Sequence, residues 1–147
     1  MRRHICSPID KPPITSCGEQ SRRHARLTVN AVSLVGRRVL IVEDNVHIAV
    51  TIAWVLKAQG AEIIGPAGTV QDALALIAGN ERIDGAALDV NLRGKMVYPV
   101  ADVLRAKNVP MVFMTGYDFR SIEPGYANVP CMQKPVAVER LMQTLFG

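Results

Sequence analysis

From residue 37 onward, short apolar segments of strand type alternate with segments whose apolar residues recur at helical spacing. The first short segment, VLIV, is the β-branched type of run that lies buried on both faces of a sheet. Strands that alternate with helices form a parallel sheet with right-handed crossovers, so this alternation predicts an α/β fold. The expected strands cover 39–42, 61–64, 85–88, 109–114 and 128–132.

Local signals predict where the helices begin and end. Asn45 and Thr69 are suited to cap the first two helices, and Gly60 is suited to end the first. Pro99 fits the first turn of the third helix, and Pro135 is expected to open the last one.

Two pairs of proline and glycine predict interruptions. Gly65-Pro66 is expected to end the second strand. Pro124-Gly125 lies within 116–127, a stretch near the minimum of about 10–12 residues that a crossover with its helix requires. We therefore expect the fourth helix to be short or missing.

Polar residues stand at the ends of four expected strands. Glu43 and Asp44 follow the first strand, Asp89 the third, Thr115 the fourth and Lys134 the fifth. Ligands of an open parallel α/β sheet bind outside the carboxyl ends of its strands, so these side chains are expected to converge there. Three carboxylates, a hydroxyl and an ammonium can hold a divalent cation and an anionic group together.

Asp89 is the pivotal residue of this set, because a carboxylate can attack phosphorus and carry an acyl phosphate. A carboxylate alone repels an anionic donor, and Mg²⁺ removes that difficulty by bridging carboxylates and phosphoryl oxygens. Glu43 and Asp44 supply further carboxylates, and the Asn91 carbonyl lies two residues past Asp89. Mg²⁺ is therefore the expected cofactor.

Lys134 and Thr115 suit the same chemistry. A lysine ammonium can pair with a carboxylate or a phosphoryl oxygen, and a threonine hydroxyl can donate to a phosphoryl oxygen. Taken singly, each residue has an ordinary structural explanation: an acidic pair after a strand favours a helix N-terminus, and Thr-Gly is common in turns. The occurrence of all of them in this order favours the functional interpretation.

Over residues 37–147 the chain resembles the receiver domains of two-component response regulators. The motifs that carry the resemblance are VLIVEDN (39–45), ALDVNL (87–92), VFMTGY (112–117) and MQKPV (132–136). The resemblance implies the flavodoxin-like, doubly wound sheet of five parallel strands in the order 2-1-3-4-5. It also implies a signal-transduction phosphoprotein rather than an enzyme, with a histidine kinase or a phosphotransfer protein as the phosphoryl donor.

The resemblance assigns a role to each matching position. Asp89 corresponds to the phosphoacceptor, which forms an aspartyl phosphate, Thr115 to the switch hydroxyl and Lys134 to the phosphate-binding lysine. The implied Mg²⁺ ligands are Glu43, Asp44, Asp89 and the Asn91 carbonyl.

Several positions depart from the usual receiver pattern. Cys131 stands where receivers usually have an aromatic switch residue, and Val136 stands where Phe is common. The stretch between Thr115 and Lys134 is also a few residues short. FMTGY is similar to the corresponding motif of FATGUY-type stand-alone receivers, except that Met114 replaces a small residue. We expect intact phosphoryl chemistry with an unorthodox coupling to output.

The positive charge of the chain lies at its beginning. The net charge is +4, and residues 1–36 hold six basic and two acidic residues, so residues 37–147 are neutral overall. The prolines and the lack of a sustained apolar period predict that 1–36 is a basic, mostly disordered extension before a receiver domain at 37–147. Such a tail can contact nucleic acid or an acidic membrane surface, whereas no direct DNA binding is expected from the folded domain.

Cysteine usage and hydropathy indicate the setting. The three cysteines form no CxxC pair, which favours a reducing, cytoplasmic location with Cys131 as a small buried residue. No apolar stretch approaches the roughly 18 residues of a membrane span. The sequence ends with the last expected helix, so output is expected through an unknown partner protein.

Two other classes of protein remain open. A receiver-like module that docks without phosphorylation would have the same fold. Missing acidic residues would favour such a module, and none of them is missing in this sequence. A phosphatase or phosphotransferase of the haloacid-dehalogenase type also attacks with an Asp, but it needs a second Asp two residues on, where this chain has Asn91.

Overall fold

A computed structural model of the chain describes residues 32–116 and 119–147. These residues belong to one compact unit, Val32–Gly147. Its helices are α2 (Val46–Ala58), α3 (Val70–Ala78), α4 (Tyr98–Ala106) and α5 (Val138–Phe146), with short 3₁₀ turns at η2 (Phe119–Ser121) and η3 (Pro124–Tyr126). Its strands are β1 (Arg38–Val42), β2 (Glu62–Ala67), β3 (Gly85–Asp89), β4 (Asn91–Leu92), β5 (Lys95–Met96), β6 (Met111–Thr115) and β7 (Cys131–Gln133).

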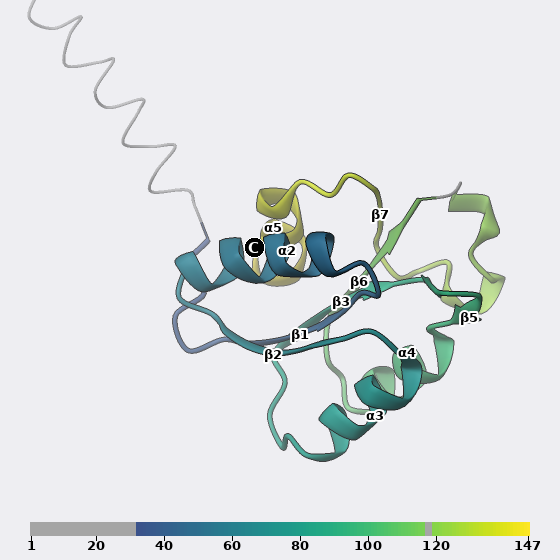
Figure 1. Ribbon diagram of the computed structural model, residues 1–147, viewed down its shortest axis with the longest axis horizontal. Coiled ribbons are helices and arrows are strands. Elements are labelled where there is room, and N and C mark those ends of the chain that lie inside the picture. The colour runs from purple at the N-terminus through teal and green to yellow at the C-terminus, as the bar shows by residue number, and fades with distance from the viewer. Residues whose placement is uncertain (1–31, 117–118) are drawn as a thin grey trace, which may run out of the picture. The chain divides into compact units, whose positions relative to one another are not determined.

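Five strands form a parallel sheet in the order β2-β1-β3-β6-β7 (Figure 1). Counting only the strands of this sheet, the order is 2-1-3-4-5, which confirms the predicted flavodoxin-like class. The separate pair β4-β5 is antiparallel and was not predicted, because strands of two residues have no readable periodicity.

The sheet is covered on both faces, and alternate residues of each strand enter different cores. Val39 and Ile41 of β1 pack with α2 and α5, whereas Leu40 and Val42 pack with α3 and α4. Figure 1 shows these two helix pairs on opposite sides of the sheet. This double cover explains why the first strand is apolar throughout instead of alternating.

The predicted helix caps are confirmed. The Asn45 side chain accepts a hydrogen bond from the Ile48 amide at 3.2 Å, and the Thr69 hydroxyl accepts one from the Asp72 amide at 3.0 Å. Each cap satisfies an amide that has no partner within its helix. Gly60, with φ of 103°, follows the end of α2.

Several predicted boundaries are wrong. The strands expected over 109–114 and 128–132 begin later, at Met111 and Cys131. β2 continues through Gly65-Pro66 to Ala67, whose carbonyl accepts a hydrogen bond from the Glu43 amide at 2.8 Å. β2 is an edge strand, where a proline without an amide hydrogen is tolerated. The last helix begins at Val138 rather than at Pro135.

The predicted shortening of the fourth crossover is confirmed, since the described residues between β6 and β7 form only η2 and η3. The 119–127 segment is attached to α4 instead. The Glu123 amide donates to the Tyr98 hydroxyl at 3.0 Å, the Tyr126 hydroxyl donates to Asp102 at 2.6 Å, and the rings of Tyr98 and Tyr126 stack at 4.3 Å. The hydrogen bond to Asp102 raises the pKa of Tyr126 to about 12.

The residues just before β1 pack with the sheet. Leu34 is fully buried between the sheet and α2, and its amide donates to the Gln59 carbonyl at 3.0 Å. Residues 1–31 lie outside the described part, so the disorder expected for the extension stays a prediction. Among the described helices, none has the length and apolar character needed to cross a membrane.

Candidate functional site

Three acidic side chains meet at the carboxyl end of the sheet. Glu43 and Asp44 follow β1, and Asp89 ends β3, which is paired with β1 in register. One carboxylate oxygen from each lies within 4.8 Å of the others. Such a cluster of hard oxygen ligands is a candidate site for a divalent cation.

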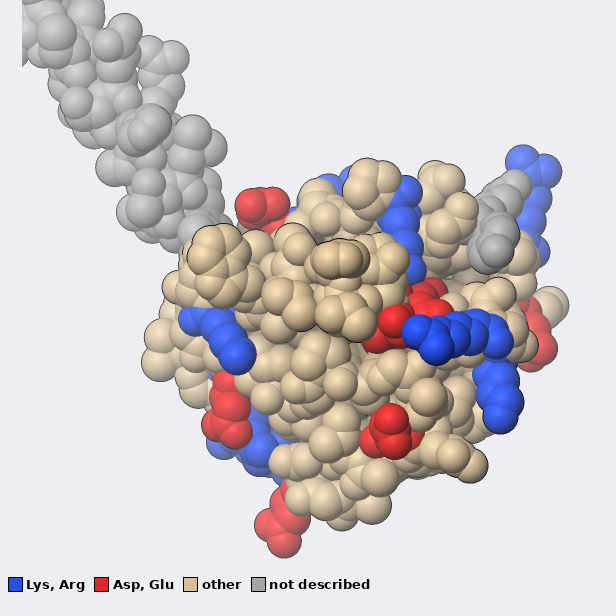
Figure 2. All heavy atoms as spheres, viewed as in Figure 1, with Lys and Arg blue, Asp and Glu red and all other residues tan. Residues whose placement is uncertain are grey.

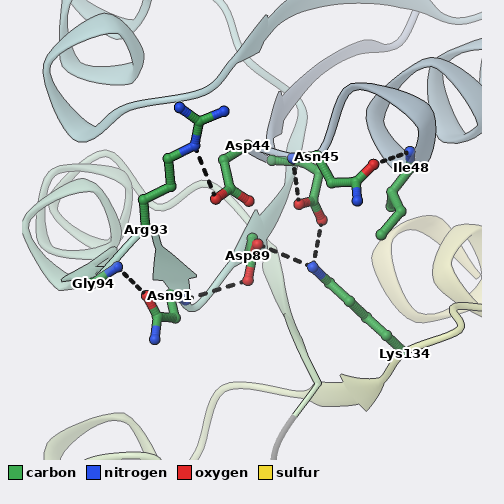
Figure 3. A network of polar contacts seen from close by, with 9 residues as sticks. Asp44, Asn45, Ile48, Asp89, Asn91, Arg93, Gly94 and Lys134 are labelled. Atoms are coloured by element: carbon green, nitrogen blue, oxygen red, sulfur yellow. Dashed lines mark hydrogen bonds and ion pairs between the residues drawn. The ribbon is translucent and has the colours of Figure 1, made fainter.

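Lys134 connects two of these carboxylates (Figure 3). Its Nζ lies 2.7 Å from Glu43 Oε1 and 3.0 Å from Asp89 Oδ2. The Lys134 amide donates to the Thr115 carbonyl at 2.8 Å, which fixes the lysine beside the end of β6. Burial alone lowers the pKa of Lys134, but its contacts with Glu43 and Asp89 outweigh burial and raise it, so the ammonium stays charged.

Asp89 is held in an environment that disfavours its ionised form. Burial, followed by the neighbouring Glu43 carboxyl, raises the pKa of Asp89 from 3.8 to about 7, although Lys134 acts in the opposite direction. Two close carboxylates with a single ammonium between them leave excess negative charge. A cation bound here would favour ionisation of Asp89.

The donor set fits a divalent cation. Glu43 Oε2 accepts a hydrogen bond from the Asn45 amide at 3.0 Å. Glu43 Oε1 is buried and lies 2.7 Å from Lys134 Nζ, its ion-pair partner. Carboxylate oxygens are the ligands that hard divalent cations take in proteins, and this cluster offers one from each of three residues.

A pocket of about 500 Å³ opens beside these carboxylates. It is lined by Asp44, Asp89, Asn91, Arg93, Gly94, Gly116 and Lys134. The Asn91 amide donates to Asp89 Oδ1 at 3.2 Å, which places the Asn91 backbone next to the cluster. Thr115 ends β6 and is buried one residue before the Gly116 that lines the pocket. The structure thus gathers the predicted residues, while their functional roles stay predictions.

Arg93 is a pocket residue that sequence reasoning missed. Its Nε lies 3.7 Å from Asp44 Oδ2 (Figure 3). The local signal for its position is Gly94, because a glycine at the second position suits a two-residue hairpin turn. Such a turn would have placed Arg93 at the tip of a hairpin that follows Asp89.

Cys131 occupies the expected place in the last strand of the sheet. It is half-buried, and burial raises the pKa of its thiol. It lines a second pocket of about 410 Å³ together with Tyr126 and Val129. Because Tyr126 and Cys131 line the same pocket, the 119–127 segment brings an aromatic ring close to β7, the strand without the usual aromatic residue.

The fold and the acidic cluster together define the receiver class, and comparison with known proteins supports this. No family model matches the sequence. SdrG from Sphingomonas melonis Fr1 is 36% identical, with 78% of this chain and 96% of that chain covered and a TM-score of 0.66. The response regulator PhyR from Brucella abortus is 26% identical, with coverages of 88% and 56% and a TM-score of 0.70.

Among curated proteins, the transcriptional regulatory protein PdtaR from Mycobacterium tuberculosis is 33% identical over 96 residues, which is 65% of this chain and 46% of that protein. The chain therefore spans about half the length of the curated relatives it matches. On these grounds the chain belongs to the response regulator receiver domains of two-component signalling.

Proposed function

We propose that this chain is a response regulator that accepts a phosphoryl group on Asp89 from a histidine kinase or a phosphotransfer protein in the cytoplasm. The observation that carries the proposal is the contact of Lys134 Nζ with both Glu43 and Asp89 inside a three-carboxylate cluster. It is a signalling switch whose output is partner binding, not an enzyme that turns over a substrate.

In the proposed transfer, an Asp89 carboxylate oxygen attacks the phosphorus of a phosphohistidine. The bond between phosphorus and the imidazole nitrogen breaks, and its electron pair leaves with the donor's nitrogen. Lys134 lies 3.0 Å from Asp89 and would keep its ammonium beside the transferred group, where it offsets the added charge. The Thr115 hydroxyl would donate a hydrogen bond to a phosphoryl oxygen.

Mg²⁺ is the cation we propose for the cluster, held by Glu43, Asp44 and Asp89 with the Asn91 carbonyl. When bound, it would neutralise the carboxylates and the incoming phosphoryl oxygens. The remaining work falls to the chain itself, since the sheet edge fixes Asp89 and Lys134 in contact before the donor arrives.

A small phosphodonor such as acetyl phosphate, supplied with Mg²⁺, tests the proposal. The intact mass should rise by one phosphoryl group in wild type and in Asp72→Asn, which changes an acidic residue outside the site. Asp89→Asn should show no gain. The proposal fails if wild type never gains the group, or if Asp89→Asn gains it equally.

A phosphorylation-independent docking module is the second candidate. Beryllofluoride is a phosphoryl mimic, and a structure of SdrG in a BeF3-activated conformation is 36% identical to this chain, with a TM-score of 0.65. Amide NMR shifts near Asp89 should change when beryllofluoride and Mg²⁺ are added. Unchanged shifts would favour the docking module.

A further inference from the structure

The β4-β5 hairpin places one arginine at the rim of the acidic pocket. Asn91 pairs with Met96, and Leu92 with Lys95, which leaves Arg93 and Gly94 as the turn. Their φ values are 53° and 90°. Positive φ at both positions is what a two-residue hairpin turn of type I′ requires, but it is uncommon for a residue other than glycine.

The hairpin is anchored firmly enough to fix the direction of its turn. The Asn91 side chain accepts a hydrogen bond from the Gly94 amide at 2.6 Å, and the Val97 amide donates to the Val90 carbonyl at 2.9 Å. Leu92 and Val97 are both buried in the core below. Arg93 therefore projects from a fixed turn and not from a loose loop.

The two cations at this site are divided between different carboxylates. Lys134 contacts Glu43 and Asp89, whereas Arg93 contacts Asp44. The Arg93 side chain is 79% exposed and its contact measures 3.7 Å, while the Asp44 side chain is only 19% exposed. A long, exposed ion pair of this kind is weak and is readily exchanged for a better partner.

We propose that Arg93 competes with the divalent cation for Asp44 and thereby sets the cation affinity of the site. Because both neutralise the Asp44 carboxylate, the nearby guanidinium weakens the attraction of a cation to it. The inference rests on the proposed function only in that the same cluster binds the cation. Arg93 acts through Asp44, so it is a positioning residue.

Calorimetric titration of the full chain with MgCl₂ at low ionic strength tests this inference. Arg93→Gln should tighten Mg²⁺ binding about two- to fivefold, the range that corresponds to the loss of an exposed ion pair. Lys95→Gln is the matched control: it removes the same charge from the same hairpin, and Lys95 is not among the residues that line the pocket beside the carboxylates. It should change the affinity less.

The inference is overturned if Arg93→Gln binds Mg²⁺ no more tightly than wild type, if Lys95→Gln has the same effect, or if wild type binds no Mg²⁺. Its failure is distinguishable from failure of the proposed function. If wild type is phosphorylated but wild type and Arg93→Gln bind Mg²⁺ with equal affinity, only the inference is refuted. Tighter binding by Arg93→Gln without any phosphorylation of wild type refutes only the function.

Discussion

At the residue scale, the site depends on an imbalance of charge. Glu43 and Asp89 are buried side by side, and Lys134 offers a single ammonium to both. A buried charge that lacks a full counter-charge costs stability, and removing the partner of a buried ion pair destabilises a fold because it leaves such a charge behind. The residues for which we propose phosphoryl chemistry are therefore a source of instability when no cation is bound.

This imbalance gives a pH dependence for the metal-free protein. The pKa of Asp89 is raised to about 7, so between about pH 4 and 7 the folded state holds a proton that the unfolded state has lost. The Asp89 contribution to the free energy of unfolding should fall as pH rises through this window, by at most about 1.4 kcal/mol per pH unit.

Urea unfolding in EDTA at several pH values measures this slope. Asp89→Asn should unfold at relatively higher urea than wild type as the pH rises, because its side chain cannot ionise. Asp72→Asn should follow the wild-type curve. Parallel curves for wild type and Asp89→Asn would show that Asp89 has no such shift.

Residues whose positions depend on their neighbours in the sequence could be predicted, whereas residues placed by contacts between distant segments could not. Asn45 caps its own helix, and Asp89 ends its own strand, so both could be placed from neighbouring residues. Arg93 reaches Asp44 across two elements that are distant in sequence, and no local pattern specifies that contact. Pro66 was misplaced because Gly-Pro usually marks a turn, while an edge strand can accept it.

At the element scale, α2 presents an unusual outer face. Val46, Val50 and Trp54 are spaced four residues apart and exposed, with Trp54 75% exposed. Figure 2 shows a largely uncharged area over α2 that borders a group of acidic side chains, and Lys57 in the last turn is the charged residue of the helix. Since α2 begins at Val46, two residues after Asp44, this face lies beside the site where a donor protein would deliver its phosphoryl group under the proposed function.

We expect Trp54 to anchor the phosphoryl donor protein. Trp54→Ser should lower the rate of transfer from the donor at least about tenfold, as is common for the loss of a buried aromatic anchor. Labelling by acetyl phosphate should be unchanged, because a small donor needs no docking surface. Trp54→Phe keeps an aromatic ring and should retain most of the transfer rate.

Equal transfer rates for wild type and Trp54→Ser would exclude this face as the docking surface. Slower labelling by acetyl phosphate would instead indicate damage to the site.

At the scale of the whole molecule, the fold extends to residues before the first strand. Leu34 is fully buried, and its neighbour Val35 is 78% exposed. Leu34→Ala should lower the free energy of unfolding by about 2–5 kcal/mol, the cost of a large-to-small change in a core. Val35→Ala should stay within about 0.5 kcal/mol of wild type.

Urea denaturation of both variants measures these changes. A similar small effect for Leu34→Ala and Val35→Ala would mean that residues 32–36 do not contribute to the stable core.

The overall topology was predictable because the alternation of strands and helices is repeated along the chain. An error at one boundary therefore does not change the predicted order of the elements. The start of α5 was not predictable, because Ala137 precedes the helix in an extended conformation and makes no side-chain capping hydrogen bond. A helix that begins without a capping side chain leaves no local signal that marks its first residue in the sequence.

The attachment of the 119–127 segment to α4 has a kinetic consequence. Side chains hold it there: Tyr126 contacts Tyr98 and Asp102, and Arg105 lies over the Tyr126 ring at 4.9 Å. Detaching it breaks these contacts without unwinding an α-helix, and loop motions of that kind run on nanosecond to microsecond time scales. Under the proposed function, a response to phosphorylation of Asp89 would need to break only side-chain contacts at this face, whereas the shift of a whole helix is a slower collective motion.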